Sequence, residues 1–386
     1  MPRRIYLDHN ATTPTHPAVL ESMLPYFTER FGNPSSVYKR AKESRRAVKE
    51  AREKVAKLIG ADPVEMIFTS GGTESDNTAL KGVAFALSDR GNHIVTSQIE
   101  HHAVLHCCRW LEKHGFDVTY VGVDHKGRID PSEIAAALTD RTILVSIMHA
   151  NNETGVIQPL SQIASVLREK NIFFHTDAVQ SVGKIPVNVG ELGVDLLSLS
   201  GHKIYGPKGV GALYKRKGTK ITSLLQGGGH ERNMRSGTEN VPGIVGLGMA
   251  SEIALREMKE NAAKERELRD RLERGVLDRI PDIVVNSQGT ERLPGTLNFC
   301  VKYVEGESIL LHLDARGIEA SSGSACTSGS LEPSHVLGAM GVPVEMAHGS
   351  LRFSIGRSNT REDIDFLLEV LPPVVEKLRA MSPMRT

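Results

Sequence analysis

Short apolar runs alternate with helix-length amphipathic segments along the first two thirds of the chain. Six of these runs predict buried strands, at residues 66–70, 93–97, 117–121, 143–148, 172–176 and 196–200. The helical spacing between them indicates βα alternation, which forms a mostly parallel sheet covered on both faces. A seventh run, 210–214, follows too closely for a parallel crossover and is predicted to be antiparallel. The predicted fold class is therefore α/β, with a mostly parallel seven-stranded sheet.

The rest of the pattern predicts a second, smaller unit. Residues 17–60 indicate helix, with Ser35 or Ser36 as the cap of a charged run that ends at Gly60. A charged amphipathic helix over 241–280 leads away from the sheet into an α+β region. Its strands are expected near 5–7, 283–286, 296–301 and 351–356, and its helices near 306–316 and 360–381. We expect a large domain, 16–255, and a small domain formed by 1–15 and 256–386, which carries a Ser/Gly-rich loop at 321–330.

Charge and composition exclude several classes of function. The 47 Lys and Arg residues nearly balance the 46 Asp and Glu residues, so the chain has no bulk field that would collect nucleic acid or anionic lipid. No run of 18 apolar residues predicts a membrane span. Four cysteines without a CxxC pair favour a reducing cytoplasm.

Two glycine-containing segments follow predicted strands. SGGTES (70–75) opens a helix, so its backbone N–H groups are suited to cradle a phosphate or carboxylate. A turn in which Thr73 merely caps the helix is an equally good interpretation. GHKIYGPK, from Gly201, has Pro207 where a P-loop has lysine, which argues against nucleotide binding by that motif.

Asp177 and Lys203 lie at the ends of two predicted strands. Open α/β sheets bind ligands at this edge, so a carboxylate and an amine could face one crevice there. A lone Asp usually caps a helix and a lone Lys usually lies in a solvated turn. Together, however, they are the two groups that a pyridoxal phosphate site requires, one for a Schiff base and one for the pyridinium proton.

Histidine and cysteine supply further candidates. His102 and His106 are spaced i, i+4 for a metal, but stacking of one imidazole of the group on a flat cofactor is the better functional interpretation, with a structural histidine as the alternative. Cys326 lies among Ser, Gly, Ala and Thr in SSGSACTSGS, so it is either a nucleophile on a swinging arm or an incidental thiol in a linker.

Arg352 is predicted within a strand, where a guanidinium needs a carboxylate partner. A substrate carboxylate would serve, although an internal Asp or Glu is the commoner answer. Asn152, at another strand end, could hydrogen-bond the same ligand. The polar glycine-rich segment 227–240 suits a phosphate or subunit contact.

Eight motifs occur together and in order along the chain: SGGTES, EHHAVL, NNETG, HTDAVQ, SGHKIYGPKG, RSGTEN, SSGSACTSGSLEPSH and LRFSIGR. In this set the chain resembles the group I (NifS/IscS-type) cysteine desulfurases of the class V aminotransferase family. The resemblance extends from YLDHNATTP to the last helix. The resemblance implies a homodimeric, fold type I pyridoxal phosphate enzyme. It would convert L-cysteine to L-alanine and hold the sulfur as a persulfide, for delivery to an iron–sulfur scaffold protein of NifU/IscU type. The TEN ending of RSGTEN and the C-terminal PPVVEKLRAMSP resemble the nitrogen-fixation branch more than the housekeeping branch, and both branches stay open.

The resemblance also assigns roles. Lys203 would bind the cofactor covalently, Asp177 would pair with its ring nitrogen, Gln180 would bond its phenolic oxygen and His101 would stack on the ring and move protons. The phosphate would be held by Gly72, Thr73, Ser200 and His202, with Thr238 from the partner subunit. Arg352 and Asn152 would take the substrate carboxylate. Cys326 would be the nucleophile, and no metal is expected beyond a transient cluster on Cys326.

Three alternatives remain open from the sequence. An aminotransferase or selenocysteine lyase would use the same cofactor site but not need Cys326. A catalytically silent scaffold would keep the fold without the chemistry. A zinc protein built on His102 and His106 is the most distant of the three.

Overall fold

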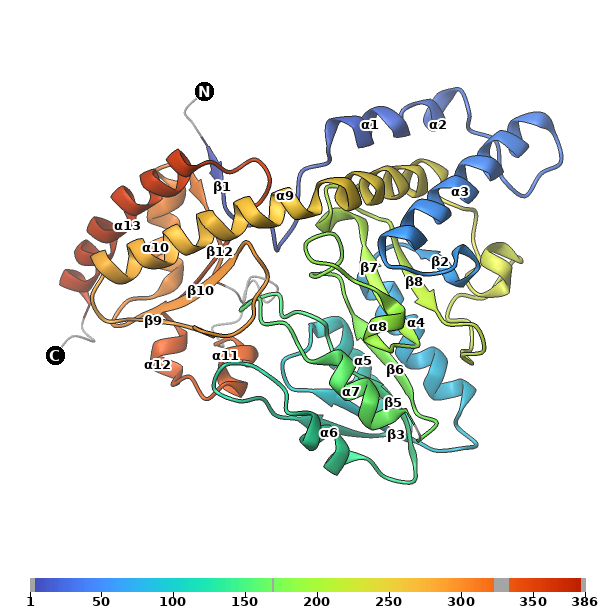
Figure 1. The fold of residues 1–386 in the computed structure, drawn as a ribbon, viewed down its shortest axis with the longest axis horizontal. Helices are drawn as coiled ribbons and strands as arrows, with labels where there is room; N and C mark the ends of the chain where they lie inside the picture. Colours follow the sequence, from blue (N-terminus) through green and yellow to red (C-terminus); the bar gives the residue numbers. More distant parts are fainter. Residues whose placement is uncertain (1–3, 169, 323–332, 383–386) are drawn as a thin grey trace.

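A seven-stranded sheet forms the centre of the larger part of the molecule. The computed structural model describes residues 4–168, 170–322 and 333–382 (Figure 1). Its strands are β2 (Met66–Thr69), β3 (His93–Ser97), β4 (Asp117–Val121), β5 (Thr142–Ser146), β6 (Phe173–Asp177), β7 (Leu196–Ser200) and β8 (Gly211–Lys215). Their order is β2-β8-β7-β6-β5-β3-β4, and β8 runs antiparallel to both its neighbours. The predicted fold class is confirmed, including the antiparallel strand.

Helices cover both faces of this sheet, which explains its continuous apolar strands. Adjacent residues of one strand enter opposite cores: Leu197 packs in the cluster that includes α3, and Leu196 in the cluster that includes α4. The covering helices are α3 (Lys39–Leu58), α4 (Gly72–Ala86), α5 (His102–Glu112), α6 (Pro131–Ala137), α7 (Leu160–Leu167) and α8 (Val189–Leu192).

The prediction of helix over 17–60 is wrong for the segment between Thr28 and Lys39. After α1 (Pro17–Met23) and α2 (Pro25–Thr28), helix resumes only at Lys39, and its cap residue Tyr38 makes no side-chain cap hydrogen bond. Neither Ser35 nor Ser36 is the cap. Pro34 disfavours helical backbone at the residue before it, and the Asn33 side chain accepts the Ser35 N–H in a local turn instead.

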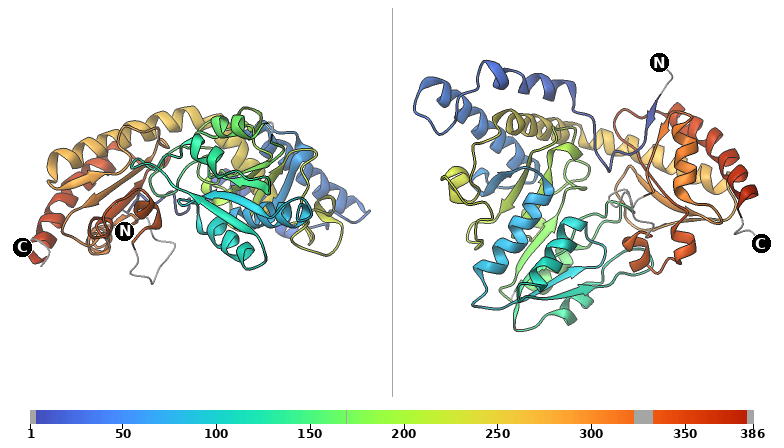
Figure 2. Two further views of the ribbon diagram at one scale, coloured as in Figure 1. Left: turned by 90° about the horizontal axis from the view of Figure 1, so that it is seen from below. Right: turned by 180° about the vertical axis from the view of Figure 1, so that it is seen from behind.

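The long helix α9 (Val241–Arg279) connects this part to the smaller unit, as Figures 1 and 2 show. There, β9 (Ile283–Val285), β10 (Thr296–Val301) and β12 (Ser350–Ser354) form an antiparallel sheet, and β1 (Ile5–Tyr6) pairs in parallel with β11 (Ile318–Glu319). Its helices are α10 (Gly306–Asp314), α11 (His335–Ala339), α12 (Val344–Ala347) and α13 (Arg361–Met381).

The smaller unit has its own apolar core. That core includes Ile5 and Leu7, the residues of α9 from Leu268 onward, and residues as far as Val375, and it is separate from the cores of the large sheet. Separate cores support the division that we propose, a large domain of 16–255 and a small domain of 1–15 with 256–386. No helix among the described residues is long and apolar enough to span a membrane.

Candidate active site

A cavity of about 230 Å³ opens at the carboxyl ends of β6 and β7, beside the start of α4. Nine of the twelve residues proposed from the sequence line it together. These are Gly72, Thr73, His101, Asn152, Asp177, Gln180, Ser200, His202 and Lys203. The other lining residues are Ala11, Asp76, Met148, Ala150 and Val179. Strand ends from one sheet edge thus converge with the N-terminal segment of the chain.

The first turn of α4 presents unfilled backbone donors to the cavity. Gly71 is the cap residue and makes no side-chain cap hydrogen bond, so Thr73 is in the first turn rather than at the cap. Gly71 has φ +154°, and a Cβ on Gly72 would lie 2.6 Å from Val179 Cγ2. Glycine at position 72 therefore allows the backbone to lie close to Val179. The backbone N–H groups of this first turn lie at the positive end of the helix dipole and are suited to bind an anion.

Two residues at the carboxyl end of β7 lie beside this turn. Ser200 is the last residue of β7, and His202 follows it in a short 3₁₀ turn. The imidazole of His202 hydrogen-bonds Thr12 Oγ1 through Nδ1 at 3.1 Å. Burial lowers the pKa of His202 to about 4, and the charges of nearby lysines add to this effect. His202 is therefore neutral near pH 7 and can contribute a hydrogen bond, but no positive charge, to a phosphate.

Lys203 ends the same turn and points its amine into the interior. Its Nζ donates to the backbone carbonyl of Asn10 at 2.5 Å and to that of Ala11 at 2.7 Å. Both carbonyls come from the segment between β1 and α1, so residues almost two hundred positions away in the sequence hold this amine.

Two buried carboxyl groups face the cavity. Asp177 accepts the backbone N–H of Val179, and burial raises the pKa of Asp177 to about 6 against the opposing effects of that N–H and of Lys203. Burial, and then the charge of Asp177, raises the pKa of Asp76, whose Oδ1 has no hydrogen-bond partner. An N–H from a bound ring would satisfy such an acceptor. The sequence interpretation overlooked Asp76, although helical spacing after Gly72 and Thr73 could have revealed it.

His101 caps helix α5 with its own ring. Its Nδ1 accepts the backbone N–H of Ala103 at 3.1 Å, so a neutral ring carries its proton on Nε2. Burial lowers the pKa of His101 to about 4, and Lys203 and other histidines add to this shift. A flat, neutral imidazole at the cavity edge suits stacking on an aromatic ring.

Arg352 is held by an internal carboxylate. It lies in β12 with 3% of its surface exposed, and its Nη2 donates to Asp8 Oδ1 at 2.6 Å. Its Nη1 donates to the backbone carbonyl of Asn152, a cavity residue, at 3.1 Å, while its Nε has no partner. The commoner of the two sequence interpretations, an internal Asp, thus describes this arginine here. Arg352 itself does not line the cavity.

Thr238 and Cys326 lie outside the cavity lining. Thr238 is exposed, in the segment between β8 and α9, and its role in a partner's site stays a prediction. Cys326 lies outside the described residues. The other three cysteines, Cys107, Cys108 and Cys300, are buried, and burial raises the pKa of each thiol, so none of them suits a nucleophile.

Both flanks of residues 323–332 are fixed near the cavity. On one side, Ser321 forms a two-way backbone bridge with Arg352. On the other, Ser334 caps α11 and donates to Glu153, and His335 bonds the carbonyl of Glu100 at 3.0 Å. Glu153 and Glu100 are the sequence neighbours of the cavity residues Asn152 and His101.

The histidine group does not form a metal centre here. The rings of His102 and His106 have centroids 4.9 Å apart, and His335 lies at the same distance from His102. Among the described residues, no three or more His, Cys, Asp or Glu side chains are arranged to hold a metal ion. The geometry therefore gives the zinc alternative no support.

The lining residues fit pyridoxal phosphate. A cavity of about 150 Å³ holds a benzene ring in another protein, so the volume here accommodates a substituted aromatic ring. The start of α4 suits the phosphate, the buried carboxyl groups suit a ring N–H, His101 suits the ring face and Lys203 supplies the amine.

Comparison with known proteins gives similarities over nearly the whole chain. The Aminotransferase class-V family matches residues 5–367. The chain is 58% identical over 383 residues to "Cysteine desulfurase IscS" of Dictyoglomus turgidum, covering 99% of this chain and 97% of that protein. It is 57% identical to the protein of the same name from Methanosarcina thermophila, covering 99% and 94%.

Solved structures show the same likeness. A "NIFS-LIKE PROTEIN" superposes with a TM-score of 0.92 at 41% identity, covering 97% of this chain and 100% of that one. A structure titled "SspA in complex with cysteine" superposes with a TM-score of 0.82 at 38% identity, covering 92% and 100%.

Proposed function

The chain belongs to the class-V aminotransferase family, and we propose on this basis that it is a pyridoxal phosphate-dependent cysteine desulfurase that converts L-cysteine to L-alanine. The observation that carries this proposal is the convergence of Lys203, Asp177 and His101 on one cavity at the sheet edge. The similarity to cysteine desulfurases, at more than half of all positions, supports the same reaction.

The protein's residues divide the work. When bound, pyridoxal phosphate withdraws electrons from the α-carbon of the attached amino acid. Lys203 anchors it and, once released, takes the α-proton on Nζ. Asp177 holds the proton on the ring nitrogen, and the start of α4 binds the phosphate. Arg352 and Asn152 bind the substrate carboxylate, for which Arg352 must exchange Asp8 for the new partner.

Cys326 is the proposed sulfur acceptor. Its thiolate attacks the sulfur of the substrate, the bond from that sulfur to the β-carbon breaks, and the carbon skeleton leaves as alanine after taking up protons. L-Cysteine and the Cys326 thiol thus become L-alanine and a Cys326 persulfide, with no external oxidant or reductant. The fixed flanks of residues 323–332, at Ser321 and Ser334, support this role because both lie beside cavity residues.

Turnover of L-cysteine tests the proposal. The purified chain, with a thiol reductant, is expected to release alanine and sulfide in equal amounts, and Lys203→Ala to abolish both. Cys326→Ala separates the desulfurase from its relatives, because a lyase or aminotransferase would keep its activity without that thiol. Unchanged turnover in Lys203→Ala would refute the assignment.

We also propose a homodimer. Large apolar side chains are exposed along α1, α2 and the segments next to them, including Leu24, Phe27, Phe31 and Val37. An exposed apolar patch of this kind is typical of a subunit interface. Exposed Thr238 would then reach the partner's phosphate site. Light scattering after size exclusion tests this, and a mass of one chain at micromolar concentration would contradict it.

The proposed destination of the sulfur is an iron–sulfur scaffold protein. This rests on the resemblance to NifS/IscS-type enzymes. The test is to form the Cys326 persulfide with labelled sulfur and to incubate this form with a purified scaffold protein of this type. The expected result is transfer of the labelled sulfur to a scaffold cysteine. Retention of the label on the enzyme would contradict it.

A further inference from the structure

Asn10 is only 3% exposed, and each of its polar atoms takes part in a hydrogen bond. The sequence interpretation overlooked this residue. Its hydrogen bonds reach the large domain, the small domain and the cavity at once. The partners are Lys203 Nζ (2.5 Å) and Gln180 Nε2 (2.9 Å) at its carbonyl, Lys184 Nζ (2.9 Å) at Oδ1, the Asn152 carbonyl (3.2 Å) and Thr296 Oγ1 (3.0 Å) at Nδ2, and Ser354 Oγ (2.9 Å) at its N–H.

The backbone carbonyl of Asn10 determines where two cavity side chains lie. It accepts from the amine of Lys203 and from the amide of Gln180, so one oxygen fixes the distance between them. Because a backbone carbonyl moves with its own residue, anything that fixes Asn10 also fixes the reactive amine.

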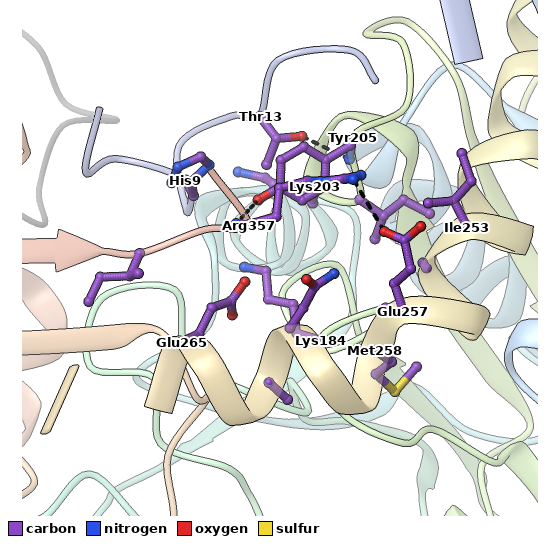
Figure 3. Close-up of a pocket in the computed structure, with 16 residues that line it drawn as sticks. His9, Thr13, Lys184, Lys203, Tyr205, Ile253, Glu257, Met258, Glu265 and Arg357 are labelled. Atoms are coloured by element: carbon purple, nitrogen blue, oxygen red, sulfur yellow. Dashed lines mark hydrogen bonds and ion pairs between the residues drawn. The ribbon is translucent and has the colours of Figure 1, made fainter. Parts of the chain in front are cut away.

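The large-domain anchor of Asn10 is the amine of Lys184, a half-buried residue. Its Nζ donates to both Asn10 Oδ1 and Gln180 Oε1, each at 2.9 Å. Figure 3 shows Lys184 and Glu265 of α9 pointing into the same small pocket. Burial, and then the charge of Lys203, lowers the pKa of Lys184 to about 7, and the charge of Glu265 opposes this lowering.

The small-domain anchor is formed by two hydroxyl groups. Thr296 in β10 accepts from the Asn10 side chain, and Ser354 in β12 accepts from its backbone. The same β12 strand carries Arg352, and Arg352 bridges to Ser321 at the start of the segment that contains Cys326. Asn10 thus lies between the reactive amine and the sheet on which the sulfur-accepting segment begins.

We propose that Asn10 is a positioning residue that couples the small domain to the Lys203 amine, with Lys184 as its large-domain anchor. The proposal rests on the function proposed above for Lys203. It assigns the side chain of Asn10 no contact with substrate and no proton transfer. Its effect is to hold one backbone carbonyl at a fixed place between the two domains.

The reactivity of Lys203 tests the proposal without any turnover. In the full chain stripped of cofactor, acetic anhydride labels free amines, and mass spectrometry measures the rate at the Lys203 peptide. Asn10→Leu keeps the carbonyl but loses the side-chain anchors. We expect Lys203 to be labelled about tenfold faster, as for loss of one hydrogen bond to a charged group. An unchanged rate would overturn the proposal.

A matched control separates positioning from stability. Asn286 is also buried and lies in the small domain, and its side chain donates to Asn298 and Cys300 rather than to Asn10 or Lys203. Asn286→Leu is expected to lower the unfolding temperature while leaving the labelling of Lys203 within about twofold. Equal acceleration in both variants would show that Asn10 acts only through stability, and would overturn the proposal.

Thr296→Val is the milder variant, in case Asn10→Leu does not fold. It removes one acceptor from the small-domain anchor with little change of shape, so a smaller acceleration of Lys203 labelling is expected. No acceleration would overturn the coupling to the small domain.

In the cofactor-loaded enzyme, Asn10→Leu should lower kcat by about tenfold with KM for L-cysteine within about twofold. If the wild type has no turnover, the function proposed above is refuted, but the rate of Lys203 labelling still tests the role of Asn10 independently.

Discussion

The two sides of the active site differ in how their charges are partnered. On the large-domain side, Asp76 and Asp177 are buried carboxyl groups, and Asp76 Oδ1 has no hydrogen-bond partner. On the small-domain side, Arg352 already has the Asp8 carboxylate at 2.6 Å. The cofactor side is therefore assembled before the ligand arrives, whereas the substrate side has to exchange one carboxylate for another. The variants below test this difference, from the largest expected effect to the smallest.

Asp177→Asn should cause the largest loss. An amide of similar shape keeps the packing but no longer favours a proton on the cofactor ring nitrogen. We expect kcat to fall by about 10³-fold, the loss typical of one preorganised electrostatic contact, while KM changes little. Steady-state alanine release measures this. A loss below about tenfold would show that the buried carboxylate is not essential, and Asp76→Asn would then be the next test.

Arg352→Gln should act mainly on substrate binding. Removing a buried cation that binds a carboxylate costs about 3 kcal/mol, so KM for L-cysteine should rise by about 100-fold. The bound cofactor should keep the absorbance spectrum of the wild type, because Arg352 does not line the cavity. If kcat fell and KM stayed the same, the arginine would have no role in binding the carboxylate.

Asp8→Asn gives a smaller effect of opposite sign on KM. Without its internal carboxylate, Arg352 is free to bind that of the substrate, so KM should fall by about threefold. The free energy of unfolding should fall too, by about 3 kcal/mol, since a buried ion pair has lost one partner. Urea unfolding and initial rates together check both. A raised KM would indicate that Asp8 orients Arg352 rather than competing with the substrate.

Glu100→Gln examines the large-domain side through stability alone. The Glu100 carboxyl is fully buried, accepts from Ser97 and from the Met148 N–H, and burial raises its pKa from 4.5 to about 8. Between these values the folded chain keeps a proton that the unfolded chain releases. The wild type should therefore lose stability relative to the variant as pH rises from 5 to 8, by at most about 1.4 kcal/mol per pH unit.

Urea unfolding of both proteins at several pH values in this window measures that difference. The glutamine variant removes the titrating group and keeps the shape, so other buried groups cancel in the comparison. Parallel stability curves for the two proteins would contradict the raised pKa of Glu100.

Local pattern predicted the strand-end residues well. Asp177 and Lys203 follow apolar runs, and βα alternation brings such ends to one sheet edge, so their meeting required no long-range information. The cap at Ser35 or Ser36 failed because Pro34 and Asn33 form a turn that the charged run did not reveal.

Residues whose roles depend on distant partners were missed. Asn10 meets Ser354 across 344 positions, and a lone Lys184 has the sequence appearance of a solvated side chain. The sequence is compatible with either a substrate carboxylate or an internal carboxylate beside Arg352, and only the fold shows Asp8 there. Contacts made by the N-terminal segment across both domains leave no local periodicity to recognise.

The most direct test of the desulfurase is mass spectrometry of the full chain after brief exposure to L-cysteine. One added sulfur is expected on the peptide that contains Cys326 and on none of the peptides with Cys107, Cys108 or Cys300, whose thiols are buried. The Lys203→Ala protein should carry no added sulfur. An unmodified Cys326 peptide in a wild-type sample that has released alanine would contradict the account.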